Sequence, residues 1–247
     1  MNILLIRPHR NDVDATALLA QGISSVSDPF LVVTPTRNAA GAQRMLNVLI
    51  SGEPCWFVLT STNALSFFEQ ALPSINLHEV FRANPHVRYA AIGKQTAHQL
   101  TACGVEDVVV AQTSYARSLL EELMNYPPTP VVIPRGSLAM QTLDFALRQA
   151  GYDVISEVLY DTTYRHQTPP SLEAIRRDEF DAVLLRSPSA ARAFDHFTSH
   201  SSLPVVCAGT TTAEHARSLE LNVVLVCEDP DPEAVALDIA DYAKGNA

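Results

Sequence analysis

The chain contains an internal repeat on the scale of a whole domain. Residues 57–68 (FVLTSTNALSFF) align with residues 183–194 (VLLRSPSAARAF), which places Ser61 over Ser187. In the same way Gly93 aligns with Gly209, and Arg7 with Arg135. The offsets of 126, 116 and 128 residues far exceed the period of solenoid repeats, which is about 20–50 residues. The repeat therefore predicts two like domains, and a cleft between domains is a common place for a ligand.

The charge of the chain restricts its partners. Its 247 residues carry a net charge of −10, which argues against DNA or RNA because phosphate binding requires a basic face. A small anionic ligand stays possible, since a site can be locally positive on an acidic protein. Hydrophobic residues make up 47% of the chain, enough for each half to bury a core.

The cysteines and the N-terminus indicate a cytoplasmic protein. Cys55, Cys103, Cys207 and Cys227 show no C-x-x-C spacing, so we expect four reduced thiols and no metal site. The first apolar run, residues 3–6, is too short for a signal peptide or a membrane span. We therefore expect a soluble chain that is not bound to a membrane.

Short apolar runs alternate with amphipathic stretches. The candidate strands, rich in Val, Ile and Leu, are 3–6, 30–33, 56–59, 89–92, 108–110, 131–133, 154–158, 182–185, 205–207 and 223–226. Helical patterns cover 11–21, 63–72, 95–103, 114–126 and 138–150, and two further helices start at Ser187-Pro188 and Asp231-Pro232. Uniformly apolar strands between helices are typical of parallel sheets covered on both faces. The predicted fold class is α/β.

The domain boundary has two solutions from periodicity alone. A tandem division separates 1–126 from 127–247 near Pro127-Pro128. An interleaved division packs the first strand and helix with the C-terminal part, so that two extended connectors lie near 32–37 and 160–170. Both divisions use the same repeat units, so the repeat does not choose between them.

Small hydroxylated residues stand at equivalent strand-to-helix turns of the repeat. These residues and the glycines beside them are Ser61, Thr62, Gly93, Thr96, Ser187, Ser189, Gly209 and Thr212. Such turns gather at the carboxyl edge of a parallel sheet, where each helix start offers free backbone N–H groups to an anion. The alternative is structural, because Ser and Thr are ordinary helix N-caps.

Basic residues and one tyrosine lie near the same turns. The basic residues are Arg7, Arg10, Arg37, Lys94, Arg135, Arg165 and Arg186. Arginine suits a carboxylate because its planar fork donates two parallel hydrogen bonds, although each could equally be solvated or paired internally. Tyr160 is protonated at neutral pH and can donate a proton, or it can be a buried aromatic residue with a satisfied hydroxyl.

Several catalytic motifs are missing from the sequence. There is no G-x-x-x-x-G-K-[ST] loop, no G-x-G-x-x-G turn and no G-x-S-x-G elbow. The eight histidines are scattered along the chain. Nucleotide hydrolysis, hydride transfer and metal-dependent hydrolysis are therefore disfavoured.

The order and spacing of eight segments resemble the uroporphyrinogen-III synthase family. They are LLIRP (4–8), VLTSTNALSFF (58–68), AIGKQTAHQLTACG (91–104), VIPRGSLAMQTLDFALRQAGYDV (132–154), VLYDT (158–162), DAVLLRSPSAARAF (181–194), VVCAGTTTAEHA (205–216) and DPEAVALDI (231–239). Together they span nearly the whole chain. The resemblance implies two similar three-layer α/β domains with parallel sheets, joined by a two-stranded linker. It implies the interleaved division, with 1–34 plus 166–247 as one domain, 38–158 as the other, and linkers near 32–37 and 159–170.

The resemblance also implies an activity. Enzymes of this family dehydrate hydroxymethylbilane, a linear tetrapyrrole with eight carboxylates, and close it with inversion of ring D to give uroporphyrinogen III. No cofactor or metal is implied. By position, Tyr160 matches the candidate proton donor of the family, and its substrate-binding residues correspond to Arg7, Ser61, Thr62, Gly93, Lys94, Thr96, Arg135, Ser187, Ser189, Gly209 and Thr212. The implied protein is a cytoplasmic monomer that could receive its substrate from the upstream enzyme.

The sequence departs from the family pattern at four positions. Arg186 replaces a Thr or Ser, Lys94 and Thr210 replace a common Pro, and Glu220 replaces a Gly. Arg186 and Lys94 could contact carboxylates or could lie on a solvated edge. The alternative functions are a non-catalytic sensor of the same fold, which binds a tetrapyrrole or another anion, and a transferase acting on a nucleotide sugar. The transferase would need a Gly-rich phosphate turn, which is not evident.

Overall fold

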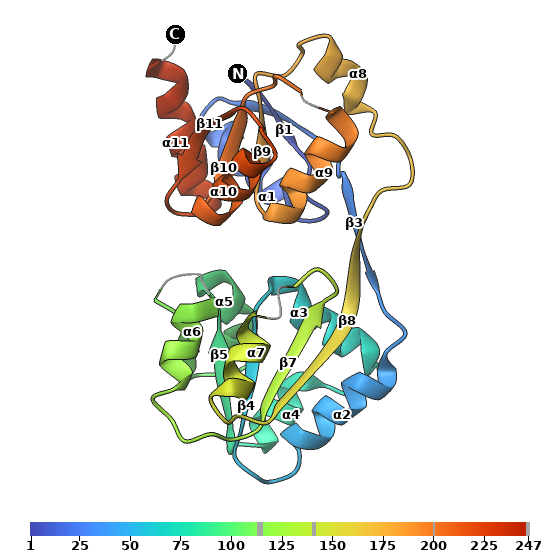
Figure 1. Ribbon diagram of the computed structural model, residues 1–247, viewed down its shortest axis with the longest axis vertical. Helices are drawn as coiled ribbons and strands as arrows, with labels where there is room; N and C mark the ends of the chain where they lie inside the picture. The colour runs from blue at the N-terminus through green and yellow to red at the C-terminus, as the bar shows by residue number, and fades with distance from the viewer. Residues whose placement is uncertain (113–115, 140–141, 200, 246–247) are drawn as a thin grey trace. The chain divides into compact units, whose positions relative to one another are not determined.

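The computed structural model describes residues 1–112, 116–139, 142–199 and 201–245. The chain divides into two compact units. Unit 1 comprises Met1–Val33 and Thr163–Ala247, and unit 2 comprises Thr34–Thr162. In Figure 1 the blue N-terminal elements accordingly lie among the orange and red C-terminal elements, whereas the middle of the chain forms unit 2.

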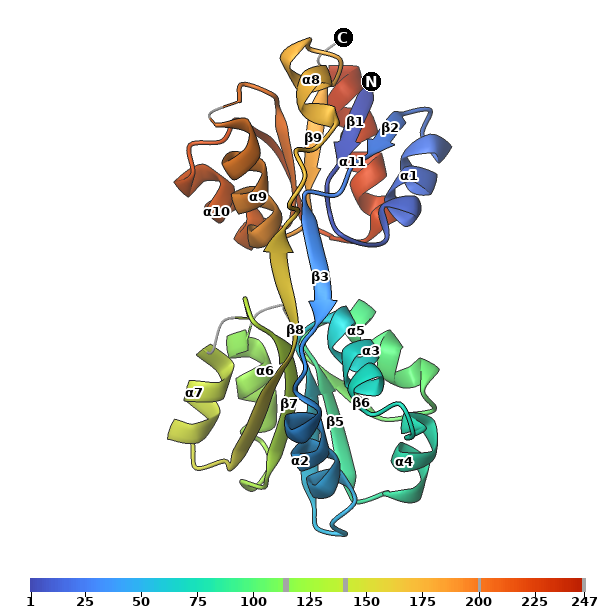
Figure 2. The same cartoon turned by 90° about the vertical axis from the view of Figure 1, so that its right-hand side faces the viewer.

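Unit 1 is built on a parallel five-stranded sheet in the order β11-β10-β9-β1-β2. Its strands are β1 (Asn2–Leu5), β2 (Ser24–Ser27), β9 (Ala182–Leu185), β10 (Val205–Ala208) and β11 (Val223–Cys227). Its helices are α1 (Asn11–Ala20), α8 (Ser171–Arg176), α9 (Pro188–Thr198), α10 (Thr210–Ser218) and α11 (Pro232–Gly245). Figure 2 shows α1 and α11 on one face of this sheet and α9 and α10 on the other.

Alternate residues of the strands of unit 1 build two cores, one on each face. Leu4 of β1 packs in a cluster with Phe194 of α9, whereas its neighbour Leu5 packs in a cluster with Leu18 of α1 and Ile239 of α11. Because both faces are covered, every residue of β9 and β10 is buried. This is a three-layer arrangement.

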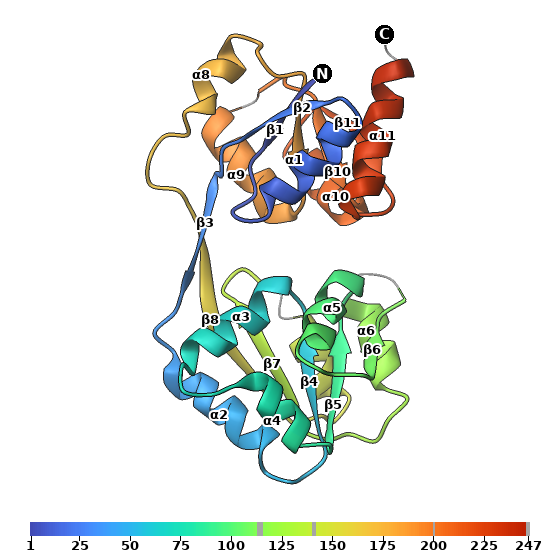
Figure 3. The ribbon, with the colours of Figure 1, turned by 180° about the vertical axis from the view of Figure 1, so that it is seen from behind.

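Unit 2 contains a six-stranded sheet in the order β3-β8-β7-β4-β5-β6. Its strands are β3 (Leu31–Pro35), β4 (Cys55–Leu59), β5 (Val87–Ala91), β6 (Val108–Val110), β7 (Val131–Gly136) and β8 (Val154–Tyr164). Its helices are α2 (Ala39–Leu49), α3 (Thr62–Ala71), α4 (Leu77–Ala83), α5 (Lys94–Ala102), α6 (Ala116–Leu123) and α7 (Thr142–Gln149). Helices α2 to α5 face the viewer in Figure 3, and α6 and α7 cover the opposite face, where Trp56 of β4 packs with Leu119 and Leu147.

The two sheets repeat one topology. If β1, β2, β9, β10 and β11 are matched with β7, β8, β4, β5 and β6, the strand order of unit 1 becomes the order of unit 2 without its edge strand β3. This is the correspondence that the sequence repeat makes when it aligns Arg7 with Arg135 and Ser61 with Ser187. The predicted fold class, α/β with parallel sheets, is confirmed.

Some elements escaped the sequence-based expectation. Strand β2 reads SSVS and has no apolar run, because it lies at the edge of its sheet and most of its residues are exposed. Helices α2, α4 and α8 were also not predicted. Ser114, expected to cap a helix, lies outside the described residues, as does part of the stretch 138–150, in which α7 begins at Thr142.

Backbone hydrogen bonds fix the two connecting segments within each unit. In unit 2 the Thr36 amide donates to the Leu159 carbonyl at 2.9 Å, and the Thr36 hydroxyl donates to the Val158 carbonyl at 2.9 Å. In unit 1 the Arg165 amide donates to the Phe30 carbonyl at 3.0 Å. Extended strands thus continue into both connections.

The four cysteines are free thiols. Cys55, Cys207 and Cys227 are buried, and burial raises the pKa of these thiols to about 11, 11 and 12. They therefore stay in the unreactive thiol form at neutral pH. None of the helices in the described ranges is both long and apolar enough to cross a bilayer.

Candidate functional site

The carboxyl edge of unit 1 is formed by the turns that follow β1, β9, β10 and β11. Since the strands are parallel, these turns lie at one edge of the sheet, and each leads into a helix. The helices that begin there are α1, α9, α10 and α11, whose first-turn backbone N–H groups have no acceptor inside the helix. Helices α9 and α11 begin with Pro188 and Pro232, which carry no N–H. Of the predicted site residues, Arg7, Ser187, Ser189, Gly209 and Thr212 belong to this edge.

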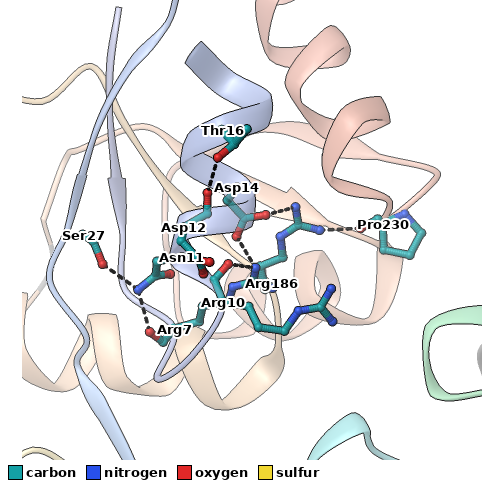
Figure 4. Close-up of polar contacts among 9 residues, drawn as sticks. All are labelled: Arg7, Arg10, Asn11, Asp12, Asp14, Thr16, Ser27, Arg186 and Pro230. Carbon is teal, nitrogen blue, oxygen red and sulfur yellow. Dashed lines mark hydrogen bonds and ion pairs between the residues drawn. The ribbon is translucent and has the colours of Figure 1, made fainter. Parts of the chain in front are cut away.

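A buried carboxylate organises this edge. Asp14 lies in the first turn of α1, and its side chain is only 1% exposed. One carboxylate oxygen lies 2.9 Å from Nη2 of Arg7, and the other forms an ion pair with Nη2 of Arg186. Figure 4 shows both guanidinium groups directed at Asp14 from two different turns. Arg7 and Arg186 are therefore paired inside the protein.

The same two arginines also bind backbone carbonyls. Arg7 donates to the carbonyl of Arg10, which is the N-cap residue of α1 and has a left-handed φ of 63°. Arg186 donates to the carbonyl of Pro230 in the turn after β11. Burial lowers the pKa of Arg7 to about 10, against the opposing effect of Asp14, so the side chain is still a cation at neutral pH.

Asn11 fixes the turn after β1 from the other side. Its amide group donates to the Arg7 carbonyl at 2.8 Å and to the Ser27 hydroxyl at 2.9 Å. Ser27 ends β2, the neighbour of β1, so Asn11 connects the turn to the sheet (Figure 4). The turn of residues 7–10 is thus held by two buried side chains, Asn11 and Asp14.

The hydroxylated residues of unit 1 act as helix caps. Ser187 is the N-cap of α9 and accepts a hydrogen bond from the Ala190 amide at 3.2 Å, and its hydroxyl lies 2.9 Å from that of Ser189. Gly209 precedes α10 with a φ of 109°, a conformation that favours glycine. Thr212 is buried in the first turn of α10.

The carboxyl edge of unit 2 carries the remaining predicted residues. Ser61 caps α3 and accepts a hydrogen bond from the Asn63 amide at 3.2 Å, with Thr62 as the first helical residue. Gly93 and Lys94 begin α5, where Lys94 is exposed. Thr96 is buried at the position equivalent to Thr212. Gly93 has an extended backbone, with φ −171°, so its conformation does not require glycine.

Tyr160 lies at the same edge of unit 2, on β8. The residue is 5% exposed, and its ring stacks on Phe67 of α3, with ring centroids 4.9 Å apart. Burial raises the pKa of its hydroxyl, while hydrogen bonds with the Ser61 side chain and the Gly136 backbone act in the opposite direction. A Cβ atom on Gly136 would lie 2.4 Å from Cε2 of Tyr160, so this ring needs a glycine at position 136.

Arg135 ends the strand equivalent to that of Arg7, and it also pairs with an aspartate in the first turn of the next helix. Its Nε atom lies 3.7 Å from the carboxylate of Asp144 and donates to the Ser156 hydroxyl at 3.0 Å. Position 186, whose arginine shares Asp14 in unit 1, corresponds in unit 2 to Thr60. Both copies of the repeat therefore have the pair of arginine and aspartate, but only unit 1 has the second arginine.

The other candidate basic residues have different surroundings. Arg165 forms an ion pair with Asp28 at 2.5 Å, and Asp28 also accepts a hydrogen bond from the Ser171 amide, so this arginine fixes a connecting segment of unit 1. Arg37 and Arg10 are exposed. In the described part of the chain, no three His, Cys, Asp or Glu side chains gather as metal ligands would.

Sequence reasoning missed four residues of these edges: Asp14, Asn11, Gly136 and Phe67. Asp14 and Asp144 follow their aligned arginines by seven and nine residues, so they do not align in the repeat and share only their place in the first turn of the next helix. The roles of Gly136 and Phe67 depend on the position of the Tyr160 ring, which no local pattern reveals.

The chain is similar to one family model and to several solved structures. The family model described as uroporphyrinogen-III synthase HemD matches residues 12–236. A mutant uroporphyrinogen III synthase from Thermus thermophilus is similar in structure, with a TM-score of 0.68, 15% identity and coverage of 100% of both chains. The synthetase from Helicobacter pylori gives a TM-score of 0.62 and 16% identity, with coverage of 98% of this chain and 99% of that chain. No match was found among curated proteins.

The family match covers far more than half of the chain, and the two similar structures share its fold over nearly their full lengths. These findings confirm the resemblance seen in the sequence: the chain belongs to the uroporphyrinogen-III synthase family.

Proposed function

We propose that this protein is a cofactor-independent hydro-lyase that converts hydroxymethylbilane into uroporphyrinogen III. The observation that carries this proposal beyond the family match is the repeated carboxyl edge, on which helix starts present backbone N–H groups in both units. A substrate with eight carboxylates suits several such anion-binding turns better than one basic patch. This also explains how a chain with a net charge of −10 can bind a polyanion.

The binding residues that we propose come from both edges. They are Arg7, Ser61, Thr62, Gly93, Lys94, Thr96, Arg135, Ser187, Ser189, Gly209 and Thr212. Ser61 and Ser187 cap their helices and so orient the first backbone amides, whereas Lys94 is exposed and can reach a carboxylate. Arg7 and Arg135 contribute positive charge at two equivalent strand ends.

Tyr160 is the proposed proton donor. Its raised pKa keeps the phenol protonated at neutral pH, so it can protonate the hydroxyl that leaves the substrate as water. The lone pair of the pyrrole nitrogen expels this hydroxyl and forms an azafulvene, which the substituted carbon of ring D attacks to give a spiro intermediate. The original bond between that carbon and its methylene bridge then breaks, and the unsubstituted carbon of ring D bonds to this bridge, so that the macrocycle closes with ring D inverted. The ring proton released after closure can return to the phenolate. The protein's main contribution is to hold the chain in the conformation that closes at the substituted carbon.

The test is the product that forms from enzymatically generated hydroxymethylbilane. The expected product is the type III isomer, because the uncatalysed closure gives type I without inversion of ring D. Formation of type I alone would disprove the synthase activity, and tight binding without turnover would favour the sensor. Tyr160→Phe should lower kcat by about 100-fold at most, since substrate orientation contributes most of the catalysis.

The cellular setting is part of the same proposal. We expect a monomer in the cytoplasm that takes its unstable substrate from the upstream enzyme. Light scattering of the purified protein tests the first expectation, and reaction rates with free substrate and with substrate freshly released by the upstream enzyme test the second. A stable dimer alone would contradict the first, and equal reaction rates with free and freshly released substrate would contradict the second.

A further inference from the structure

Asp14 ties together three turns of the carboxyl edge of unit 1. Its carboxylate pairs with Arg7 from the turn after β1 and with Arg186 from the turn after β9. Arg186 continues to the carbonyl of Pro230 in the turn after β11. Each of these turns leads into a helix, so one buried network links the starts of α1, α9 and α11 (Figure 4).

Arg186 is too enclosed to serve mainly as a surface ligand for a substrate, whereas Arg7 is slightly more open and can add its charge to a substrate site while Asp14 holds it. The side chain of Arg186 is 10% exposed, and that of Arg7 is 17% exposed. The Nε atoms of both are buried and have no hydrogen-bond partner among the described residues. Their Nη2 atoms are engaged with Asp14. These features indicate that the two arginines hold the turns of the edge in place.

Stability alone does not account for such a network. Replacing a buried cluster of charges by apolar residues is often neutral or stabilising, because burial of the ions costs more than their attraction returns. Burying two Nε–H donors without acceptors adds a further cost. We therefore expect the network to serve a different purpose, which is to fix the geometry of the turns.

The internal repeat supplies a natural comparison. In unit 2, Asp144 pairs with Arg135 at 3.7 Å, and Thr60 occupies the position equivalent to Arg186. Threonine cannot bridge from a carboxylate to the carbonyl of a third turn. Unit 2 therefore shows that a domain of this topology folds with one arginine for each aspartate.

We propose that Asp14 and Arg186 are positioning residues for the synthase reaction, which hold the turns after β1, β9 and β11 so that the starts of α1 and α9 are preorganised for substrate carboxylates. This inference rests on the proposed function. It assigns neither residue a direct role in the bond-making steps.

The first experiment replaces Arg186 by the residue that unit 2 has. Arg186→Thr leaves one arginine on Asp14, as in the pair of Arg135 and Asp144, so the variant should fold. We expect KM for hydroxymethylbilane to rise about tenfold, the equivalent of one charge-assisted hydrogen bond, with kcat changed less than about threefold. The control Arg176→Thr removes the same charge from the exposed pair of Arg176 and Glu173 in unit 1 and should leave KM unchanged. An unchanged KM for Arg186→Thr overturns the proposal.

The second experiment separates charge from geometry. Arg186→Lys keeps the charge but has no fork to join Asp14 to Pro230, so KM should lie between those of the wild type and Arg186→Thr. Asp14→Asn increases the positive charge of the edge but frees both arginines. Positioning predicts a higher KM for Asp14→Asn, whereas charge alone predicts a lower one. If that variant does not fold, Asp14→Glu keeps the charge and shifts the carboxylate, and an unchanged KM there contradicts the positioning role.

The third experiment does not depend on turnover. In hydrogen exchange, the amides of residues 7, 9–11, 228, 229 and 231 should exchange faster in Arg186→Thr than in the wild type, while the β-strands of unit 1 keep their protection. Unchanged exchange in both turns would show that Arg186 does not hold these turns in place. If the wild type makes no type III product but the amides of the turns exchange faster in the variant, the proposed function is wrong, while the structural role of the network is supported. If the wild type makes type III and the variant matches it in KM and exchange, only this inference fails.

Discussion

The carboxyl edges of the two units have the same plan but different chemistry. In both, the aligned arginine at a strand end pairs with an aspartate in the first turn of the next helix. In unit 1 the aspartate is shared by a second arginine, and the edge is a network of buried charges. In unit 2 the edge instead carries the buried phenol of Tyr160 with Ser61 and Gly136. A duplicated fold can thus keep its framework while its two copies carry different polar groups at the same edge.

The difference can be traced to a few positions of the repeat. Arg186 in unit 1 corresponds to Thr60 in unit 2, whereas Ser187 and Ser61 are both helix caps. The strand registers also place Ser27 beside Leu5 and Ser156 beside Ile133, which are equivalent pairs. Ser27 accepts a hydrogen bond from Asn11, whereas Ser156 accepts one from Arg135. Two serines at equivalent positions therefore accept hydrogen bonds from different residues, Asn11 in unit 1 and Arg135 in unit 2.

The largest expected effect tests whether the charged network is confined to unit 1. Asp14→Asn leaves two buried guanidinium groups without a counter-ion and should lower the free energy of unfolding of unit 1 by about 3–5 kcal/mol. The matched variant Asp144→Asn should cost about 1 kcal/mol, because Arg135 keeps its hydrogen bond to Ser156. Urea unfolding followed by hydrogen exchange assigns each loss to its unit. Fluorescence of Trp56, the single tryptophan, provides a second signal for unit 2.

Equal losses for the two variants would contradict the comparison, since they would mean that the second arginine adds nothing. A loss confined to unit 1 in Asp14→Asn, with unit 2 unfolding as in the wild type, is the expected pattern.

The fold could be predicted from the sequence to a large extent. The alternation of apolar runs with helical patterns predicted parallel α/β sheets, because strands such as β4 and β9 are buried on both faces and so are uniformly apolar. Strand β2 was missed for the opposite reason, since an edge strand with exposed serines has no apolar signal. Helix α4 has seven residues and helix α8 six, too short for a clear period.

The candidate site was less predictable than the fold. Ser61 and Ser187 could be assigned to helix starts, because N-caps are local features. The partners of Arg7 and Arg186 could not, since the ion pair between Asp14 and Arg186 joins residues 172 positions apart in the chain. Only the three-dimensional packing shows that these arginines are enclosed.

The next effect probes the edge of unit 2 by adding volume. Gly136→Ala would place a Cβ atom 2.4 Å from the Tyr160 ring, so the ring must move at a cost of about 1–3 kcal/mol in stability. Because the phenol is displaced, kcat should fall at least as far as in Tyr160→Phe. Adding Tyr160→Leu to Gly136→Ala removes the clash and should recover most of the lost stability but not kcat. A fully active Gly136→Ala variant would show that the position of this ring is unimportant.

A smaller effect is expected from the stack beneath Tyr160. Phe67→Leu removes the aromatic partner 4.9 Å from the Tyr160 ring and should cost about 0.5–1.5 kcal/mol beyond the lost area, with kcat lowered less than about tenfold. The neighbouring variant Phe68→Leu affects a ring that packs on Phe57 in the core. It should lower the unfolding midpoint without changing kcat. If Phe68→Leu lowered kcat and Phe67→Leu did not, the aromatic residue that matters for the reaction would be Phe68 in the core.

The smallest expected effect concerns pH, and it tests both edges at once. Burial lowers the pKa of Arg7 only to about 10 and raises that of Tyr160, so both groups keep their protons throughout the neutral range. Because the proposed donor must be protonated and the network must be charged, kcat should change less than about twofold between pH 6.5 and 8.5 and fall only near the pKa of Tyr160. A steep dependence near neutral pH would contradict Tyr160 as the donor, and His215 would not explain it, since burial and Arg192 lower the pKa of that histidine below its usual value. Since Tyr160→Phe removes the titrating phenol, the residual kcat of this variant should no longer fall at high pH. If kcat of the variant still fell there, the fall would be assigned to Arg7 in unit 1.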